Sequence, residues 1–290
     1  MKKIAGVVLV ILGIIMFSHA IWWSPLNFFV PHDTNSEKHF PINDVHTIQL
    51  DVTSEELQIL PTDEDKMKVV ATGRDLNHVN FNVDRNGNKV KINLKPKWYS
   101  LSDTNELNLI IYIPKDKLVD INAIARSRVV EIGEAKGSKW DMANLNAEVT
   151  SGTFNLHNLK LGSFIYNGTS TDVIMDRVQA GKAIMDTFSG NMNISHFIGS
   201  LNIASTSGNV RIQIDKLVGD IHTEMISGNL NMYLPVSSSF MLNAQLQSGQ
   251  FTSKYPLEVN RPSSTISTAR AGKGEYKIKT EIANGDFILY

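Results

Sequence analysis

Four charged residues near the middle of the chain are the strongest candidates for catalytic chemistry. Asp172, Asp176 and Asp186 lie on neighbouring segments, and Arg177 directly follows the second of them. Polysaccharide lyases with a parallel β-helix fold place acidic metal ligands and a basic residue together on one outer face. Aspartate is also favoured at turns, where its side chain bonds the local backbone. We therefore interpret all four as structural or surface residues, and we predict no catalytic residue.

The histidines lack the spacing of a metal site. His157 and His196 come six and seven positions after the serines that begin their segments, so they are one position out of register. His222 precedes its serine and belongs to a different kind of strand. No two histidines show close ligand spacing such as His-x-His. We predict that the protein holds no metal and no cofactor.

Two loops have some features of ligand-binding loops. Residues 133–139, GEAKGSK, have three residues between the glycines where a phosphate loop has four, and no strand–loop–helix pattern surrounds them. The acidic segment PTDEDK at 61–66 is of a kind that is usually a solvated turn. Neither loop therefore predicts a binding site.

Ser-Gly pairs recur along the second half of the chain and predict its architecture. They begin at positions 151, 189, 207, 227 and 248, with spacings of 38, 18, 20 and 21 residues. Ser170-Thr171 divides the longest spacing into 19 and 19, so the period is about twenty. Such a period with two strands per repeat is typical of a β-solenoid. Glycine tolerates the positive φ of a tight corner, and serine bonds the turn backbone. Five copies therefore indicate corners and argue against a catalytic serine.

The residues after each serine alternate in polarity, which predicts the strand register. The third and fifth positions are apolar, and the fourth is mostly polar. Side chains alternate faces along a strand, so we expect Val210 to point inward and Arg211 outward. The outward asparagines form a polar face that is either an ordinary solvated surface or a site for a glycan or another extended partner. These asparagines are Asn155, Asn193 and Asn231.

The segment before the repeats is also rich in strands. Short alternating runs such as HTIQLDV, KMKVVATG and ELNLIIYIP follow one another from Val45 onward. Asn86-Gly87 within DRNGNK predicts a hairpin turn. We predict an all-β domain over 45–290. It is a short β-solenoid-like stack of about twenty-residue coils, preceded by additional β-strands and carried on one N-terminal transmembrane helix.

The N-terminus predicts that helix. Two lysines precede an apolar run, and no acidic or basic residue other than a histidine occurs over 4–30. About twenty apolar residues span a bilayer. Trp22 and Trp23 suit the interfacial aromatic belt, and Pro25 ends the helix. We predict a single-pass anchor over 1–30 that contacts membrane lipid.

The charges around the anchor predict its orientation. Lysines before it and the polar HDTNSE after it place the N-terminus in the cytoplasm and the domain outside the cell membrane. Residues 31–44 are polar, contain two prolines and predict a linker. The alternative is a signal peptide cleaved after Ala20, which exports the same domain.

Composition narrows the classes of partner. The chain has no cysteine, which excludes disulfides, thiolate metal sites and lipid-modified cysteines. Its formal net charge is -1, and it has no basic block of the kind that follows a phosphate backbone. Nucleic acid is therefore not an expected partner, whereas an envelope protein or a glycan is. The sequence does not define the oligomeric state.

Several of these segments together resemble a known family. LDVTSEELQIL, IYIPKD, MYLPVSSSF and the closing YKIKTEIANGDFILY, with the Ser-Gly coils and the apolar N-terminus, resemble the LiaG-like putative adhesin family of bacterial envelope proteins. The resemblance covers nearly the whole chain. It implies a membrane-anchored β-solenoid or β-sandwich-like module linked to cell-envelope stress, and it supplies no catalytic residues.

Together these features predict a non-enzymatic module that binds or senses something at the outer face of the membrane. A polysaccharide-active enzyme on the same scaffold is the first alternative. A second alternative is a structural protein that associates through an open solenoid end, because the final FILY segment would form an exposed edge strand.

Overall fold

The computed structural model describes residues 33–74, 76–97, 107–262 and 266–290. In the described residues, the unit from Thr34 to Tyr290 consists of strands, connecting turns and one short 3-10 turn, η2 (Leu76–His78). Within the described ranges no helix has the length and apolar character needed to cross a membrane. The transmembrane segment predicted over 1–30 lies outside these ranges. The prediction of an all-β fold is confirmed.

The N-terminal part of the unit supplies six strands. Asn86 aligns with Lys89 in the antiparallel pair β4–β5, and Gly87 in the turn has a φ of 59°. The hairpin predicted from Asn86-Gly87 is therefore confirmed. The six strands are β1 (Asp33–Pro41), β2 (Thr47–Thr62), β3 (Lys66–Arg74), β4 (Val79–Asn86), β5 (Lys89–Pro96) and β6 (Asn108–Pro114).

The remaining part of the unit contains the coils and a short C-terminal addition. Its first strands are β7 (Asp120–Ile132), β8 (Trp140–His157), β9 (Leu159–Asp176), β10 (Gln179–Ser189), β11 (Met192–Ser207), β12 (Val210–Lys216) and β13 (Ile221–Ser227). Its last strands are β14 (Leu230–Tyr233), β15 (Phe240–Ser248), β16 (Phe251–Ser253), β17 (Glu258–Pro262), β18 (Ile266–Ala271), β19 (Tyr276–Asn284) and β20 (Phe287–Leu289).

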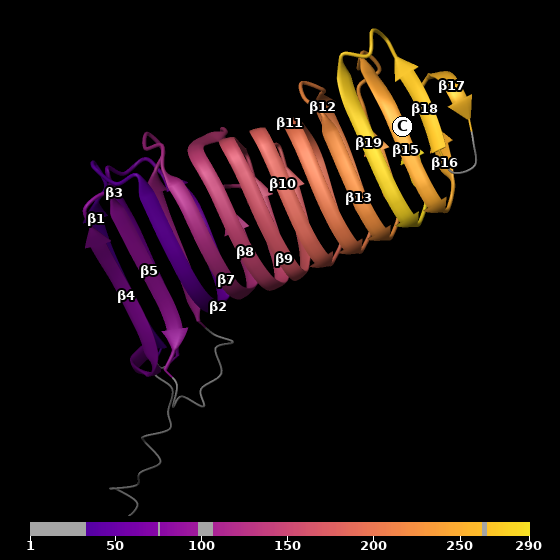
Figure 1. The fold of residues 1–290 in the computed structure, drawn as a ribbon. Coiled ribbons are helices and arrows are strands. Elements are labelled where there is room, and N and C mark those ends of the chain that lie inside the picture. Colours follow the sequence, from indigo (N-terminus) through magenta and orange to yellow (C-terminus); the bar gives the residue numbers. More distant parts are fainter. Residues whose placement is uncertain (1–32, 75, 98–106, 263–265) are drawn as a thin grey trace, which may run out of the picture. The chain divides into compact units, whose positions relative to one another are not determined.

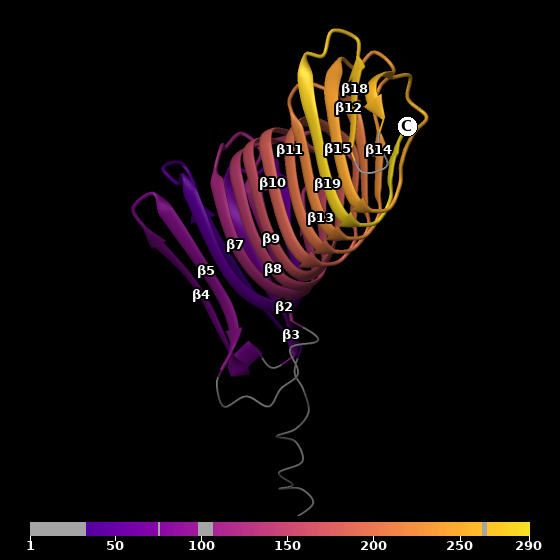
Figure 2. The same ribbon diagram turned by 45° about the vertical axis from the view of Figure 1, so that its right-hand side comes forward.

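These strands form two sheets around one apolar core, as Figures 1 and 2 show from two directions. The first sheet runs in the order β4, β5, β2, β7, β8, β9, β10, β11, β13, β19, β15, β18 and β17. The second runs β1, β3, β6, β2, β7, β8, β9, β11, β12, β14, β20 and β16. Long strands occur in both sheets because they bend from one into the other. The predicted solenoid-like stack of coils is confirmed.

Strand β1 occupies most of the segment predicted to be a linker. Its residues pair with β3, and Glu37 forms an ion pair with Lys68 at 3.1 Å. The linker prediction for 31–44 is therefore wrong over Asp33–Pro41. An edge strand needs little apolar surface, and here only Phe40 packs against the core, so the polar sequence gave no sign of pairing.

The predicted register of the coils is confirmed. Val210 and Ile212 are fully buried, whereas Arg211 between them is exposed. Parallel pairing with β14 aligns Val210 with Leu230, so equivalent positions stack coil on coil. Burying an apolar side chain stabilises the fold by about 2 kcal/mol. The two inward columns thus hold the stack together.

One edge of the stack, the Ser-Gly edge, is built from the Ser-Gly corners. Gly208 has a φ of 132°, and a Cβ placed there would lie 2.0 Å from the carbonyl oxygen of Gly190 in the preceding coil. Side-chain oxygens then link successive corners: the backbone N–H of Asn209 donates to Asn191 Oδ1, and that of Asn229 donates to Asn209 Oδ1, both at 3.0 Å. Close backbone approach is therefore what requires glycine at this edge.

The other edge, called here the opposite edge, has glycine at Gly133 but carries three stacked non-glycine corners in the following coils. Asn158, Arg177 and His196 lie one above another with φ of 53°, 54° and 54°. Side chains hold this edge: Arg177 donates to Asn158 Oδ1 at 2.7 Å, and His196 pairs with Asp215 at 3.0 Å.

The order of the last coils in space differs from their order in the sequence. Strand β19 lies between β13 and β15, parallel to both (Figure 1), and β20 lies between β14 and β16. The FILY segment therefore has a paired strand on each side, and the expectation that it forms an exposed edge is wrong. Its sequence carries the same alternation as any coil, so it fits inside the stack as well as at its end.

Antiparallel strands cover three of the four sheet ends. Strands β4 and β3 close the N-terminal ends of the two sheets, with β1 beyond β3, and β18 and β17 close the C-terminal end of the first. The fourth end is β16, which has three residues and is followed by Lys254 and Pro256. A short edge strand flanked by lysine and proline is poorly suited to further pairing. The described part of the chain thus gives little support to association through an open end.

Candidate functional site

The four charged candidates do not converge on one site. Asp172 lies at the Ser-Gly edge, where its Oδ1 accepts the backbone N–H of Asn191 at 2.7 Å. Asp176 lies at the opposite edge and pairs with Arg177 at 2.6 Å. Asp186 lies on the outer face of the first sheet. Asp172, Asp176 and Arg177 thus stabilise the coil edges, which agrees with their interpretation as structural residues.

His157 and His196 lie on different coils and do not form a common site. His157 is half-buried on the second sheet, and its Nδ1 has no hydrogen-bond partner among the described residues. His196 pairs with Asp215 at the opposite edge. His222 differs, because it points from β13 onto the outer face of the first sheet, which also carries Glu224 and Glu281.

The outer face of the second sheet is occupied by its own side chains near the C-terminal end. Tyr233 and Tyr290 stack with ring centroids 4.3 Å apart. The guanidinium of Arg211 lies 4.2 Å from the centre of the Tyr233 ring, and the ammonium of Lys254 lies 4.3 Å from that of Tyr290. Cation–π contacts of this kind stabilise surface pairs by about 0.5–1 kcal/mol. Because these rings already contact one another and two cations, we do not assign a ligand to them.

The outer face of the first sheet has the composition of a binding surface. Phe188 on β10 is 63% exposed and Ile226 on β13 is 55% exposed. Strand β11 lies between them and contributes shorter side chains, including Ala204. Exposed amide and hydroxyl side chains on this face alternate along the strands with buried ones, and Glu148, Ile165 and Lys182 are exposed among them. The amide and hydroxyl residues are Asn146, Thr150, Asn167, Thr169 and Asn202.

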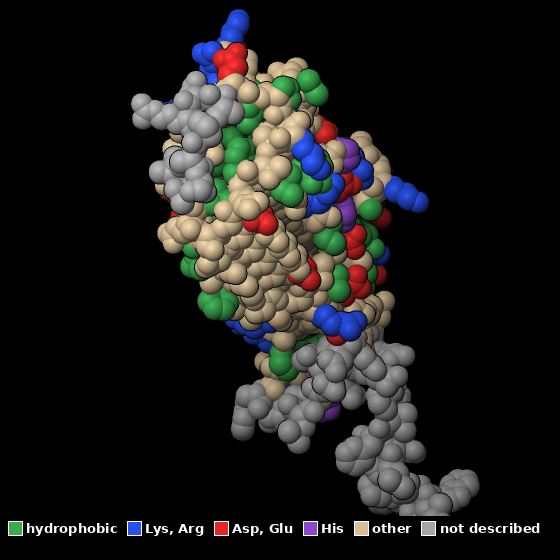
Figure 3. Space-filling view, turned by 90° about the vertical axis from the view of Figure 1, so that its right-hand side faces the viewer, with side chains coloured by type: hydrophobic (Ala, Val, Ile, Leu, Met, Phe, Trp, Pro, Cys, Tyr) green, Lys and Arg blue, Asp and Glu red, His purple; other side chains and the backbone are tan. Residues whose placement is uncertain are grey.

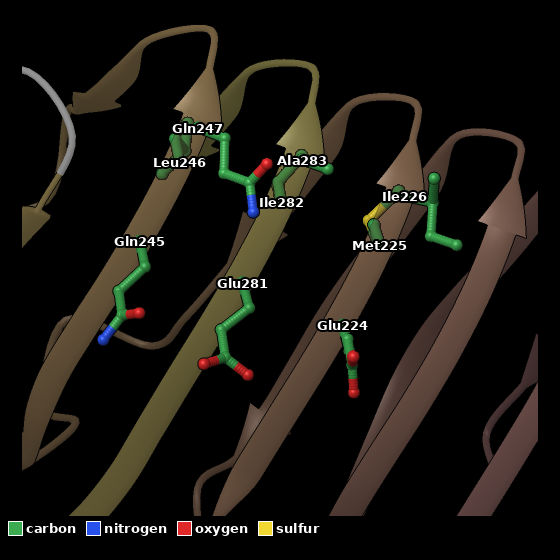
Figure 4. A pocket seen from close by; sticks show the side chains of 9 residues that line it. All are labelled: Glu224, Met225, Ile226, Gln245, Leu246, Gln247, Glu281, Ile282 and Ala283. Atoms are coloured by element: carbon green, nitrogen blue, oxygen red, sulfur yellow. The ribbon is translucent and has the colours of Figure 1, made fainter.

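A shallow groove lies on this face across β13, β19 and β15, with a volume of about 590 Å³. Figure 4 shows that Glu224, Glu281 and Gln245 project from three neighbouring strands toward the same side. Apolar groups line the other end of the groove, with Ile226 and Ala283 on adjacent strands. The groove therefore offers both polar and apolar contacts to one ligand.

Charged side chains are distributed unevenly over the surface. Figure 3, viewed toward the C-terminal end, shows acidic, basic and histidine side chains along one margin, beside a broad area of backbone and uncharged polar side chains. Asp186 and Glu224 have no ion-pair partner among the residues that the structure describes. The outer face of the first sheet therefore has local negative charge at these two carboxylates, while the exposed Lys182 lies at the other end of β10 on the same face.

Perturbed titratable groups lie away from the groove. Partial burial acts to raise the pKa of the Asp51 carboxyl, but hydrogen bonds from Lys95 and Arg126 outweigh it and hold the pKa below its usual value. Burial raises the pKa of Tyr166 to about 12, because its ring is enclosed in the core against Phe154. Asp51 lines a separate pocket of about 390 Å³ that also contains Lys91 and Glu148. Its lowered pKa follows from its hydrogen bonds to Lys95 and Arg126.

Sequence reasoning missed the residues of the groove. Glu281 lies 57 residues from Glu224 and reaches it only because β19 is inserted beside β13. The His-x-Glu spacing at 222–224 was the one available sign, since residues two apart on a strand point the same way.

Comparison with known proteins shows the family to which the chain belongs. The sequence matches the family called Toastrack DUF4097 over residues 45–289. The chain belongs to the Toastrack family. Its match covers the coils and the strands before them, so the Toastrack domain is the whole described unit apart from β1 and the residues beside it. Among proteins with curated descriptions, none matches this chain.

Solved structures are similar to this chain at low sequence identity. A protein from Bacteroides fragilis described as a putative adhesin is 10% identical, with a TM-score of 0.52, and the match covers 88% of this chain and 97% of that one. A putative lipid-binding protein from Parabacteroides distasonis is 14% identical, with a TM-score of 0.49, and 89% and 97% of the chains are covered. At these identities the likeness to the Bacteroides protein shows the fold alone. The finer LiaG-like resemblance stays a prediction.

Proposed function

We propose that this protein is a non-enzymatic binding module of the cell envelope. In this proposal, the apolar segment over 4–30 anchors it in the membrane, and the Toastrack domain outside the membrane binds an extended polysaccharide along the outer face of its first sheet. The adhesin description of the Bacteroides neighbour is consistent with such a role.

The observation that carries the proposal is the composition of that face. Amide and hydroxyl side chains occur on several neighbouring coils, where Ile165 and Ile184 lie between Asn146 and Asn202. Phe188 lies on the same face with 63% of its surface exposed. Sugars offer hydroxyls to amides and apolar ring faces to aromatic side chains. The unpaired Asp186 and Glu224 favour a polysaccharide without negative charge.

The polymer is favoured over a small substrate because contacts are spread over several strands. The groove is shallow, and the four charged residues that could have formed a catalytic cluster are divided among both edges and one face. A general acid and base must both reach one bond. The arrangement thus supports binding better than the alternative of a polysaccharide-active enzyme.

The test uses the full chain in detergent, sedimented with insoluble chitin, insoluble cellulose and beads of anionic pectate. We expect binding to an uncharged polymer and none to pectate. Phe188→Ser should weaken that binding about tenfold, since central aromatic contacts contribute more than about 1 kcal/mol. The matched control is Val236→Ser, because Val236 is 83% exposed in a loop away from this face.

Both substitutions remove an exposed apolar side chain, so neither should alter the melting temperature. The proposal fails if the chain sediments with none of the polymers. It also fails if Phe188→Ser and Val236→Ser bind equally well, or if pectate is preferred.

The anchor and the link to envelope stress are separate parts of the proposal. The anchor predicts a reporter after Tyr290 that is active only outside the cell, and a mature chain that begins at Met1 or Lys2. A mature chain that begins at Ile21 would instead show a cleaved signal peptide. The stress link rests on the LiaG-like resemblance and predicts that expression rises after cell-wall damage; unchanged expression would remove it.

A further inference from the structure

We propose that His222, Glu224 and Glu281 form a Zn²⁺ site at the polar end of the groove. Their ligand atoms all lie within 4.8 Å of one another, and His222 Nε2 is 4.0 Å from Glu281 Oε2. Tetrahedral Zn²⁺ with bonds near 2.1 Å holds its ligand atoms about 3.4 Å apart. Small side-chain rotations therefore suffice to close the site.

The strands place these three groups without strain. His222 and Glu224 are two residues apart on β13, so both point to the outer face. Parallel pairing puts Glu281 of β19 directly beside Glu224. Two ligands thus come from one strand and the third from its neighbour, and all three backbones are fixed by ladder hydrogen bonds.

The side-by-side glutamates are electrostatically unfavourable without a cation. Like charges directly opposite one another on neighbouring strands destabilise a sheet. Other carboxylates on this face avoid this arrangement, since Asn167 lies between Glu148 and Asp186. Glu224 is exposed and has no ion-pair partner among the described residues. A bound cation would relieve this repulsion.

Lys279 supplies only part of the missing positive charge. Its ammonium lies 3.0 Å from Glu281 Oε1 and leaves Glu224 unpaired. The adjacent Asn243, aligned with Lys279 on β15, has a buried Oδ1 with no hydrogen-bond partner. A buried acceptor without a partner needs an explanation. If Zn²⁺ takes the Glu281 carboxylate, the released Lys279 ammonium has this acceptor beside it.

The ligand types select the metal. Zn²⁺ binds imidazole nitrogen together with carboxylate oxygen, whereas Ca²⁺ and Mg²⁺ prefer oxygen ligands alone. Three protein ligands leave a fourth position for water. The assignment does not depend on the proposed function, because Zn²⁺ binding is measured without any polysaccharide.

The test is calorimetric titration of the full chain in detergent with ZnCl₂, without a polyhistidine tag. We expect one Zn²⁺ per chain and no saturable binding of Ca²⁺ or Mg²⁺. Glu224→Gln should weaken Zn²⁺ binding at least about tenfold, because an amide is a poor Zn²⁺ ligand. Lys279→Met should tighten binding, because it removes the cation that competes for Glu281.

Glu148→Gln is the matched control, since Glu148 is an exposed carboxylate on the same face without a neighbouring histidine. It should leave Zn²⁺ affinity unchanged, and melting curves should show all variants folded. The site is refuted if the chain binds no Zn²⁺ or if Glu224→Gln binds it as tightly as Glu148→Gln does. Weaker binding by Lys279→Met would equally refute it, because nonspecific binding to surface histidines does not predict a gain.

Discussion

The chain turns from one sheet to the other by different means at the two edges of the coils. At the Ser-Gly edge the chain turns by bringing backbone against backbone, so that Gly208 has no room for a side chain. At the opposite edge Arg177 and His196 adopt positive φ with full side chains, and their hydrogen bonds to Asn158 and Asp215, respectively, link successive coils. The first edge is fixed by sterics and repeats in the sequence. The second depends on individual contacts and varies from coil to coil.

The largest expected loss of stability comes from a substitution in the inward column next to the Ser-Gly edge. Val210→Asp places a carboxylate in the first inward column, which should lower the free energy of unfolding by about 4 kcal/mol. Arg211→Asp, one residue on, should cost only about 1 kcal/mol, chiefly through the lost contact with Tyr233. Chemical denaturation of the two variants checks this, and equal losses would contradict the register.

A glycine substitution tests the steric account of the edge. Gly208→Ala should cost about 3 kcal/mol, because its φ of 132° is nearly restricted to glycine and the new Cβ meets a carbonyl oxygen. Gly87→Ala is the control: its φ is 59° and nothing lies near the added Cβ, so about 1 kcal/mol is expected. If the two melting temperatures fall equally, close backbone approach is not what requires glycine.

A smaller effect is expected from the side chains that link the corners. Asn209→Ala removes the acceptor for the backbone N–H of Asn229, which should cost about 1 kcal/mol. Asn193→Ala removes an exposed amide of the same size without such a role, and its cost should stay within about 0.5 kcal/mol. Denaturation midpoints that coincide for the two variants would show that the linkage contributes nothing.

The smallest effect is predicted at the opposite edge. His196→Asn keeps a residue that tolerates positive φ and loses only an exposed pair with Asp215. Its free energy of unfolding should change by less than about 0.5 kcal/mol. A loss as large as that of Gly208→Ala would remove the distinction between the two edges.

Sequence patterns predicted the coils because their determinants are local. The alternation around Val210 and the glycine at most of the corners follow from contacts with the adjacent coil, about twenty residues away, and the coils repeat this pattern. The strands before the repeats were equally predictable from the sequence, as the Asn86-Gly87 hairpin shows. These features predict the fold class and the strand register, but they do not indicate which coil lies next to which.

The parts that could not be predicted depend on which elements become neighbours. Any coil with the right alternation can pair with any other, so nothing local places β19 between β13 and β15. The groove and the meeting of Glu224 with Glu281 follow from that choice. Strand β1 was missed for a related reason, since an edge strand shows few apolar residues.

The inserted coil also determines when the stack can be completed. Middle coils close loops of about 19 residues, whereas Glu281 must return across 57 residues to reach Glu224. The added entropic cost of that longer loop is only about 1 kcal/mol, but contacts distant in sequence slow folding. Until residues 276–290 fold into place, β13 and β15 each have one unpaired side. We therefore expect the groove to be among the last features to form.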